Sequence, residues 1–264
     1  MPLVETSGAG VVRTLTLNRP EQRNAVSSAM LVELVRAPVD LTVDPECRAV
    51  VLRGEGKDFC SGADMKELAE ARADETRIPS GMSLEEALRT ISTHPVPVIA
   101  QVQGAALGAG CQVVVACDLA VAAEDARFAI PSARLGILLN YESVERLVLA
   151  VGPKRAGELL YTGRVISGEE AMAWGLVNDA VEPEALAART ERMAIAIADA
   201  APLSVRGSKR GISGVLERLS LDRLAEAHRV ADFDSMAARA LASEDLEEGL
   251  RAFRERRRPE FRGK

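Results

Sequence analysis

The sequence predicts an α/β fold whose last part is entirely helical. Strand-like and helix-like segments alternate through the first part of the chain, and the strand pattern stops near residue 183. Such alternation is typical of a sheet built from βα units. Hydrophobic residues make up 47% of the 264 residues but aromatic residues only 3%, so we expect a core of aliphatic side chains.

Five segments have the pattern of strands. The first alternates in polarity and stops at Pro20, while the third is apolar almost throughout, which predicts burial on both faces of the sheet. The five expected strands are residues 10–20, 47–56, 95–104, 118–128 and 175–181.

Apolar residues at helical spacing lie between these strands. Ser167, followed three residues later by Glu170, is a capping signature for a further helix. The other expected helices are residues 27–39, 83–92, 112–117, 143–152 and 154–163, and then 182–200, 203–214 and 220–253. With a boundary near 195–205, we expect a core at 1–200 and an assembly region of amphipathic helices at 201–264.

Composition argues against several classes of function. The net charge of −6 and the pI of about 5.3 do not suit a nucleic-acid surface. The first residues lack the basic and apolar parts of a secretory signal, and no apolar run approaches the roughly 20 residues that cross a bilayer. The four cysteines form no CxxC pair and there are only two histidines, so we expect reduced thiols, a cytoplasmic protein and no metal site.

The segment GAALGAGCQVVVACD, residues 104–118, joins a glycine-rich turn to an apolar helical stretch. Such a turn exposes backbone N–H groups at the start of a helix, where an anion can bind. Taken alone, the GAG sequence at 108–110 is equally compatible with close packing of a helix on a strand.

Five blocks in a fixed order carry a more specific signal. They are LNRPEQRNAV (17–26), GKDFCSGADMKEL (56–68), residues 99–119, YTGRVISGEEAMAWGLVNDAV (161–181) and FRERRRPEFRGK (253–264). Together they resemble the crotonase superfamily, also called the enoyl-CoA hydratase/isomerase family, over essentially the whole chain. The resemblance implies a crotonase-like spiral of ββα units, homotrimers or hexamers built as dimers of trimers, and an acyl-coenzyme A thioester as ligand, with no separate cofactor.

The resemblance also implies an oxyanion site. The backbone N–H groups of Ala63 and Ala109 would meet the thioester oxygen as negative charge builds on it, and small residues let the backbone approach within about 3 Å. The C-terminal arginine run either reaches the phosphates or stays solvated, and Phe261 is its only aromatic residue, which disfavours nucleic-acid stacking. Coenzyme A would contact Arg23, Ala25, Ser61, Gly62, Asp64 and Gly108.

Three positions that hold carboxylates in relatives hold neutral residues here: Gln112, Ser132 and Asn140. An amide does not exchange protons near neutral pH, and a serine without a base is a poor substitute. Each positioned acid or base is typically worth 10²–10⁴ in rate. We therefore expect a protein that binds acyl-CoA and polarises its carbonyl without activating water.

Other functions stay open from the sequence. Glu142 either points into the acyl pocket as a base or lies with Glu145 on the exposed face of a helix start. An active enzyme would then isomerise acyl-CoA through Glu142, or decarboxylate it, because loss of CO₂ forms the enolate without proton abstraction. A purely structural trimer would bind no acyl-CoA.

Overall fold

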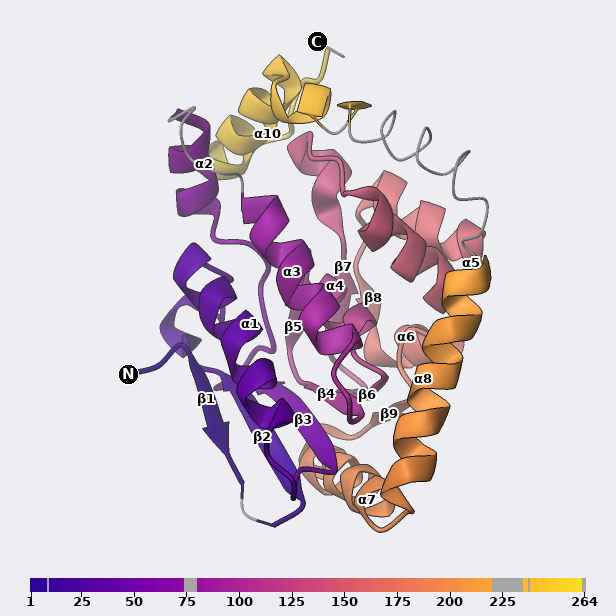
Figure 1. Ribbon diagram of the computed structural model, residues 1–264. Helices are drawn as coiled ribbons and strands as arrows, with labels where there is room; N and C mark the ends of the chain where they lie inside the picture. Colours follow the sequence, from indigo (N-terminus) through magenta and orange to yellow (C-terminus); the bar gives the residue numbers. More distant parts are fainter. Residues whose placement is uncertain (9, 74–79, 220–234, 237, 263–264) are drawn as a thin grey trace.

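The computed structural model describes residues 1–8, 10–73, 80–219, 235–236 and 238–262. Its larger sheet has six strands in the order β1-β2-β3-β4-β6-β9, and neighbouring strands are parallel except for the antiparallel pair β1 and β2 (Figure 1). These strands are β1 (Val4–Ser7), β2 (Val12–Leu17), β3 (Ala49–Gly54), β4 (Val98–Val102), β6 (Leu119–Ala123) and β9 (Asp179–Val181).

A smaller sheet has the order β5-β7-β8. Strands β5 (Ala105–Leu107) and β7 (Arg127–Ala129) are parallel, and β8 (Ile166–Ser167) is antiparallel to β7. Residues 105–107, which the glycine-rich pattern indicated as a turn, therefore form a strand. The expected strand 118–128 is likewise two strands, one in each sheet. These pairings join segments far apart in the chain, so local sequence does not reveal them.

From β4 to β7, consecutive strands enter different sheets, and this builds the repeated ββα unit. β4 and β5 are followed by α4 (Ala109–Ala116), and β6 and β7 by α5 (Tyr141–Thr162). After β3, Cys60 pairs with Ala106 of β5 before the chain enters α2 (Met65–Ala73). The predicted winding of ββα units is confirmed.

Helices cover both faces of the larger sheet. On β3, Val50 and Leu52 belong to the main core, to which α1 (Ser28–Thr42) and α3 (Ser80–Ser92) contribute side chains. Val51 points to the other face and packs with Ala194 of α7 (Leu186–Ala198). Strand β4, for which the sequence predicts burial on both faces, is arranged in the same way: Val98 and Ala100 belong to the main core, and Ile99 belongs to the cluster that contains Ala194. The prediction is confirmed.

Two local predictions have clear outcomes. Ser167 and Glu170 form the expected capping box at α6 (Gly168–Trp174): Ser167 Oγ accepts from the Glu170 N–H at 3.1 Å, and Glu170 Oε2 accepts from the Ser167 N–H at 3.2 Å. The two helices expected at 143–152 and 154–163 are both present within α5, because the non-helical torsions of Gly152, before Pro153, separate α5 into two helical segments.

The last described helices are α8 (Pro202–Leu219) and α10 (Glu244–Glu255). The Lys209 ammonium ties α8 to the core, because it donates to Asp118 Oδ2 at 2.7 Å and to the Val96 carbonyl at 3.1 Å. The helix predicted at 220–253 lies partly outside the described residues. Among the described residues, no helix has the length and apolar character that a membrane span requires. The role of residues 201–264 in assembly stays a prediction.

Candidate functional site

Two chain segments meet where the sequence places the oxyanion site. The loop 60–62 precedes α2, and residues 107–110 lead into α4. A Cβ added at Gly62 would lie 3.0 Å from the Leu107 carbonyl oxygen and 3.9 Å from the Ala109 nitrogen, and one added at Gly110 would lie 2.3 Å from the Cys60 carbonyl oxygen. Glycine at these positions therefore permits a backbone-to-backbone approach that any side chain would obstruct.

Within the described residues, each segment leaves N–H groups without an acceptor, and those of Ala63 and Ala109 are among them. On either side of Ala63, the Val26 N–H donates to the Gly62 oxygen at 2.8 Å and the Asp64 N–H donates to the Val26 oxygen at 2.9 Å. Ala109 is the first residue of α4, so its N–H precedes the intrahelical bonds. Within the described residues, neither the Ala63 nor the Ala109 N–H has a hydrogen-bond acceptor.

The backbone at Ala109 suits an alanine. The non-glycine residues with positive φ among those described are Arg23, Asn24 and Arg256, so Ala109 has the negative φ that its side chain requires. Gly108 carries the positive φ of +53° instead, and its N–H donates to the Ala129 oxygen at 2.8 Å. The start of α4 thus combines a free N–H with the positive end of the helix dipole, an arrangement that stabilises negative charge.

The expected coenzyme A residues lie on the segments around this loop. Arg23 donates through Nε to Asp58 Oδ2 at 2.7 Å, and Asp58 Oδ1 accepts from the Ala105 N–H at 2.8 Å. Hydrogen bonding from Arg23 holds the pKa of Asp58 below its usual value. The Arg23 side chain is still 51% exposed, and Arg127, 57% exposed, lies 3.7 Å from Asp58. The cluster therefore has one cation more than it has anions.

Backbone contacts join the rest of this group. The Ser61 N–H donates to the Arg23 oxygen at 3.0 Å, and the Ala25 oxygen accepts from Arg19 at 3.1 Å. Arg19 also binds Asp64 at 2.8 Å, and Asp64 Oδ1 accepts from the Lys66 N–H at the start of α2. The segments that contain residues 23–25 and 61–64 are thus fixed side by side.

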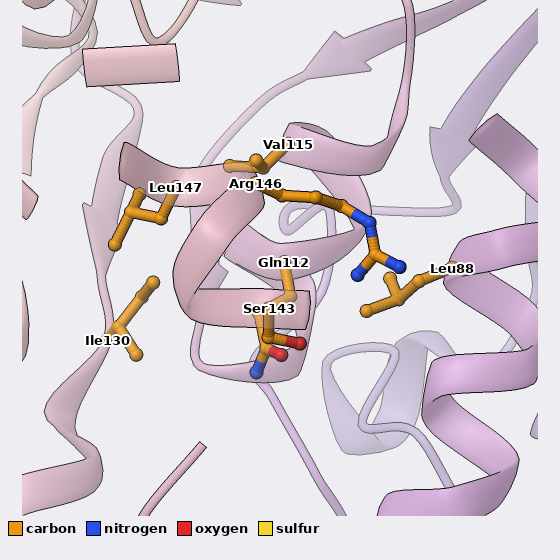
Figure 2. Close-up of a pocket in the computed structure, with 7 residues that line it drawn as sticks. All are labelled: Leu88, Gln112, Val115, Ile130, Ser143, Arg146 and Leu147. Atoms are coloured by element: carbon orange, nitrogen blue, oxygen red, sulfur yellow. The ribbon is translucent and has the colours of Figure 1, made fainter. Parts of the chain in front are cut away.

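Gln112, one turn into α4, lines a small pocket with side chains of α3 and α5 and with Ile130 (Figure 2). Its polar lining consists of Gln112, Ser143 and Arg146, and its apolar lining of Leu88, Val115, Ile130 and Leu147. The lining side chains fill it so closely that no water molecule fits. No carboxylate is among the described residues that line it.

The other candidate residues lie outside this lining. Ser132 is half-buried in the 3₁₀ turn η2 (Pro131–Leu135), and Glu142 is exposed in the first turn of α5. Asn140 caps α5: its Oδ1 accepts from the Ser143 N–H at 3.0 Å. Its amide donates to Glu85 Oε2, also at 3.0 Å.

Sequence reasoning missed Glu85. This residue of α3 binds Arg146 through both carboxylate oxygens, with Arg146 Nη1 at 3.1 Å from Oε2 and Nη2 bonded to Oε1. Ser143 Oγ makes a longer contact of 3.5 Å with the same carboxylate. Glu85 is 55 residues before Asn140 and 61 before Arg146, and no motif connects them, so only the packing of α3 on α5 reveals the cluster.

The cysteine thiols and the C-terminal arginine run are two further groups that the sequence singled out. Burial raises the pKa values of Cys60 and Cys111 to about 12, so these thiols beside the site stay protonated and are poor nucleophiles. In the C-terminal arginine run, Arg257 binds Glu248 and Glu255, and hydrogen bonding chiefly from Arg257 holds the pKa of Glu248 far below its usual value. Arg257 is therefore committed to an internal network.

Comparison with known proteins gives consistent matches. The profile of the enoyl-CoA hydratase/isomerase family matches residues 7–264. A Thermus thermophilus protein named as an enoyl-CoA hydratase is 38% identical, over 96% of this chain and 98% of its own length. Mevalonyl-coenzyme A hydratase of Aspergillus fumigatus is 35% identical, with coverages of 94% and 90%. A solved structure of methylmalonyl-CoA decarboxylase in complex with 2-nitronate-propionyl-CoA superimposes with a TM-score of 0.88 at 28% identity, covering 99% of both chains.

Proposed function

Because the chain belongs to the enoyl-CoA hydratase/isomerase family of the crotonase superfamily, we propose that it binds an acyl-CoA thioester with the carbonyl oxygen between the N–H groups of Ala63 and Ala109. The observation that carries this proposal is the pair of N–H groups without acceptors, on two segments in backbone contact. Donors already in place lose little energy to reorganisation when charge develops on the thioester oxygen.

In this proposal, the protein lacks the acid–base groups of a hydratase. Gln112, Ser132 and Asn140 stand in this proposal at the carboxylate positions of relatives, and none of them takes up or releases a proton near neutral pH. The Gln112 amide lines the pocket, while Asn140 is engaged in capping α5 and in binding Glu85. The protein would then carry or sense acyl-CoA in fatty-acid or acyl-CoA metabolism.

Coenzyme A would lie along the segments that contain residues 23–25, 61–64 and 108. Arg23 is the cation proposed to face its phosphates, because half of its side chain is exposed although Asp58 pairs with it. Ala25, Ser61, Gly62, Asp64 and Gly108 would contact the ligand mainly through backbone atoms. A positively charged patch on an acidic protein gives a polyanionic ligand a preferred place to bind.

Decarboxylation is a second candidate function. It needs the oxyanion site but no base, because departure of CO₂ leaves its electron pair on the α-carbon as the enolate. The similarity to methylmalonyl-CoA decarboxylase, at a TM-score of 0.88, favours it. Isomerisation with Glu142 as base is the remaining catalytic alternative, although Glu142 is exposed and does not line the described pocket.

Assembly into trimers or hexamers through residues 201–264 and a cytoplasmic location complete the proposal. Exposed apolar side chains on α8 support the assembly: Leu203, Ile212 and Val215 are 86%, 63% and 58% exposed. Such residues are commonly covered when a chain associates with copies of itself.

The decisive experiment measures binding and turnover on one preparation. Calorimetry with acyl-CoAs of increasing chain length should show binding, and the same protein should not hydrate crotonyl-CoA. Hydration at a rate normal for the family would contradict the assignment of Gln112 and Ser132. Absence of all binding would leave only a structural trimer, and release of CO₂ from a carboxylated acyl-CoA would favour the second candidate. If turnover is found, Glu142→Gln should abolish it only when Glu142 is the base.

A further inference from the structure

The polar wall of the pocket beside Gln112 is held in place from outside the pocket. Arg146 lines the pocket, whereas Glu85, which binds its guanidinium through both oxygens, does not. The two side chains are 22% and 20% exposed, and the carboxylate also accepts a hydrogen bond from Asn140. Glu85 therefore restrains the guanidinium of Arg146 from outside the described lining.

Arg146 keeps hydrogen-bonding capacity beyond its two bonds to Glu85. A guanidinium has five N–H groups, and two of them suffice for the two bonds to Glu85. The Nε–H and the second N–H of each terminal nitrogen have no acceptor within the described residues. The Gln112 amide, which lies in the same lining (Figure 2), likewise has no side-chain partner among them.

The pocket lies close to the proposed carbonyl site. Gln112 is three residues after Ala109 in α4, and a rise of about 1.5 Å per residue separates them by about 4.5 Å along the helix axis. An acyl substituent a few bonds beyond the thioester carbonyl would therefore reach the level of Gln112. Because the pocket is filled in this conformation, the flexible Arg146 side chain has to adjust when such a substituent enters.

We propose that Arg146, oriented by Glu85, determines specificity by selecting acyl groups that carry an oxygen acceptor beyond the thioester; this inference rests on the proposed function. A neutral hydroxyl and a carboxylate share this acceptor chemistry. A plain alkyl chain would instead bury three N–H groups without an acceptor, and buried donors left unpaired weaken binding.

The test compares three ligands on the unmodified protein: butyryl-CoA, 3-hydroxybutyryl-CoA and succinyl-CoA. At least one oxygen-bearing ligand should bind about tenfold more tightly than butyryl-CoA, as expected for one hydrogen bond to a charged donor. The oxygen-bearing ligand that binds more tightly shows whether a hydroxyl or a carboxylate supplies the acceptor. Equal or tighter binding of butyryl-CoA overturns the inference, whereas failure of all three to bind contradicts the proposed function itself.

Variants then assign the selectivity to Arg146. Arg146→Met should remove the preference for oxygen-bearing acyl groups, because methionine keeps much of the volume without the donors. Glu85→Gln should shift the preference toward succinyl-CoA, since the guanidinium loses its counter-ion. Glu86→Gln makes the same charge change on the exposed neighbour of Glu85 and should change nothing. Retention of the preference in Arg146→Met would overturn the assignment, and a change in Glu86→Gln equal to that in Glu85→Gln would show a general effect of charge.

Discussion

At the scale of single residues, the site depends on main-chain groups rather than on reactive side chains. Two alanines supply the proposed donors, and buried thiols beside them are kept protonated by pKa values of about 12. Arg146, the charged residue in the described lining of the pocket, is held in an ion pair by Glu85, which lies outside that lining. Changes that remove a backbone N–H should therefore have larger effects than changes at the alanine side chains.

Ala109→Pro removes one donor with little disturbance of α4. Ala109 is the first residue of the helix, where proline is well tolerated because the N–H has no intrahelical partner. We expect a smaller infrared shift of the carbonyl band of bound acyl-CoA. Ala109→Gly keeps the N–H and should preserve the shift, whereas an unchanged shift in the proline variant would exclude Ala109 from the site.

His94 should make stability depend on pH. The ring is buried, and this burial, together with the nearby Lys209 charge, lowers its pKa. Hydrogen bonds with the Val96 and Pro38 carbonyls and the charge of Asp118 raise the pKa by less, so the net shift is downward. The unfolded state therefore binds a proton at His94 near pH 6.5, whereas the folded state binds it only at a lower pH. This contribution to stability is complete above pH 6.5 and is lost as the pH falls through the folded-state pKa.

Urea unfolding at pH 7.5 and at pH 5.5 checks this expectation. The free energy of unfolding should fall more for the unmodified protein than for His94→Gln, whose amide does not titrate. An equal fall in both proteins would assign the pH dependence to other groups.

At the scale of secondary-structure elements, the ion pair of Lys209 and Asp118 attaches α8 to the sheet. Lys209 is 9% exposed and Asp118 25%, and the same carboxylate oxygen accepts from the Val98 N–H at 2.8 Å. Asp118 thus joins β4 and α8, a structural role consistent with its place at the end of α4.

Lys209→Met should destabilise the protein strongly. It leaves the Asp118 carboxylate partly buried without its cation, which costs about 3 kcal/mol, the lower end of the range for broken buried pairs, since a quarter of Asp118 is exposed. Lys154→Met on α5, at an exposed lysine, is the control and should change the free energy of unfolding little. Equal stability of the two variants, measured by denaturant unfolding, would show that the pair contributes nothing.

At the scale of the whole molecule, apolar side chains on α8 point away from the described core. Ile212 and Val215 lie three residues apart, so they share one helix face, and both are more than half exposed. That face is the surface on which we expect copies of the chain to associate.

Light scattering after size exclusion should give the mass of a trimer or hexamer of 28.2 kDa chains. The double variant Ile212→Asp and Val215→Asp should lower that mass, because two charges would be buried in the interface. The control variant Val32→Asp, at a 67% exposed residue of α1, should leave the mass of the assembly unchanged. A monomer in the unmodified protein would contradict the proposed assembly.

Much of the fold was predictable because its signals are local. The capping box at Ser167 and Glu170 and the apolar run in β4 are properties of a few neighbouring residues, and both appear where expected. The ββα winding was predictable from the resemblance of five blocks. The short strands β5 and β8 were not, because three and two residues carry little pattern and their partners are distant in the chain.

The sequence by itself determined the family, the glycines that let two backbone segments touch, and the neutral side chains at 112, 132 and 140. Only the tertiary structure decided which polar and charged groups meet: Glu85 of α3 binds Arg146 of α5 and Asn140, the residue that caps α5, and Glu142 remains exposed. The physical reason is the distance along the chain between the residues that interact. Turn geometry and helix capping depend on residues a few positions apart, whereas an ion pair between helices depends on how the whole chain packs.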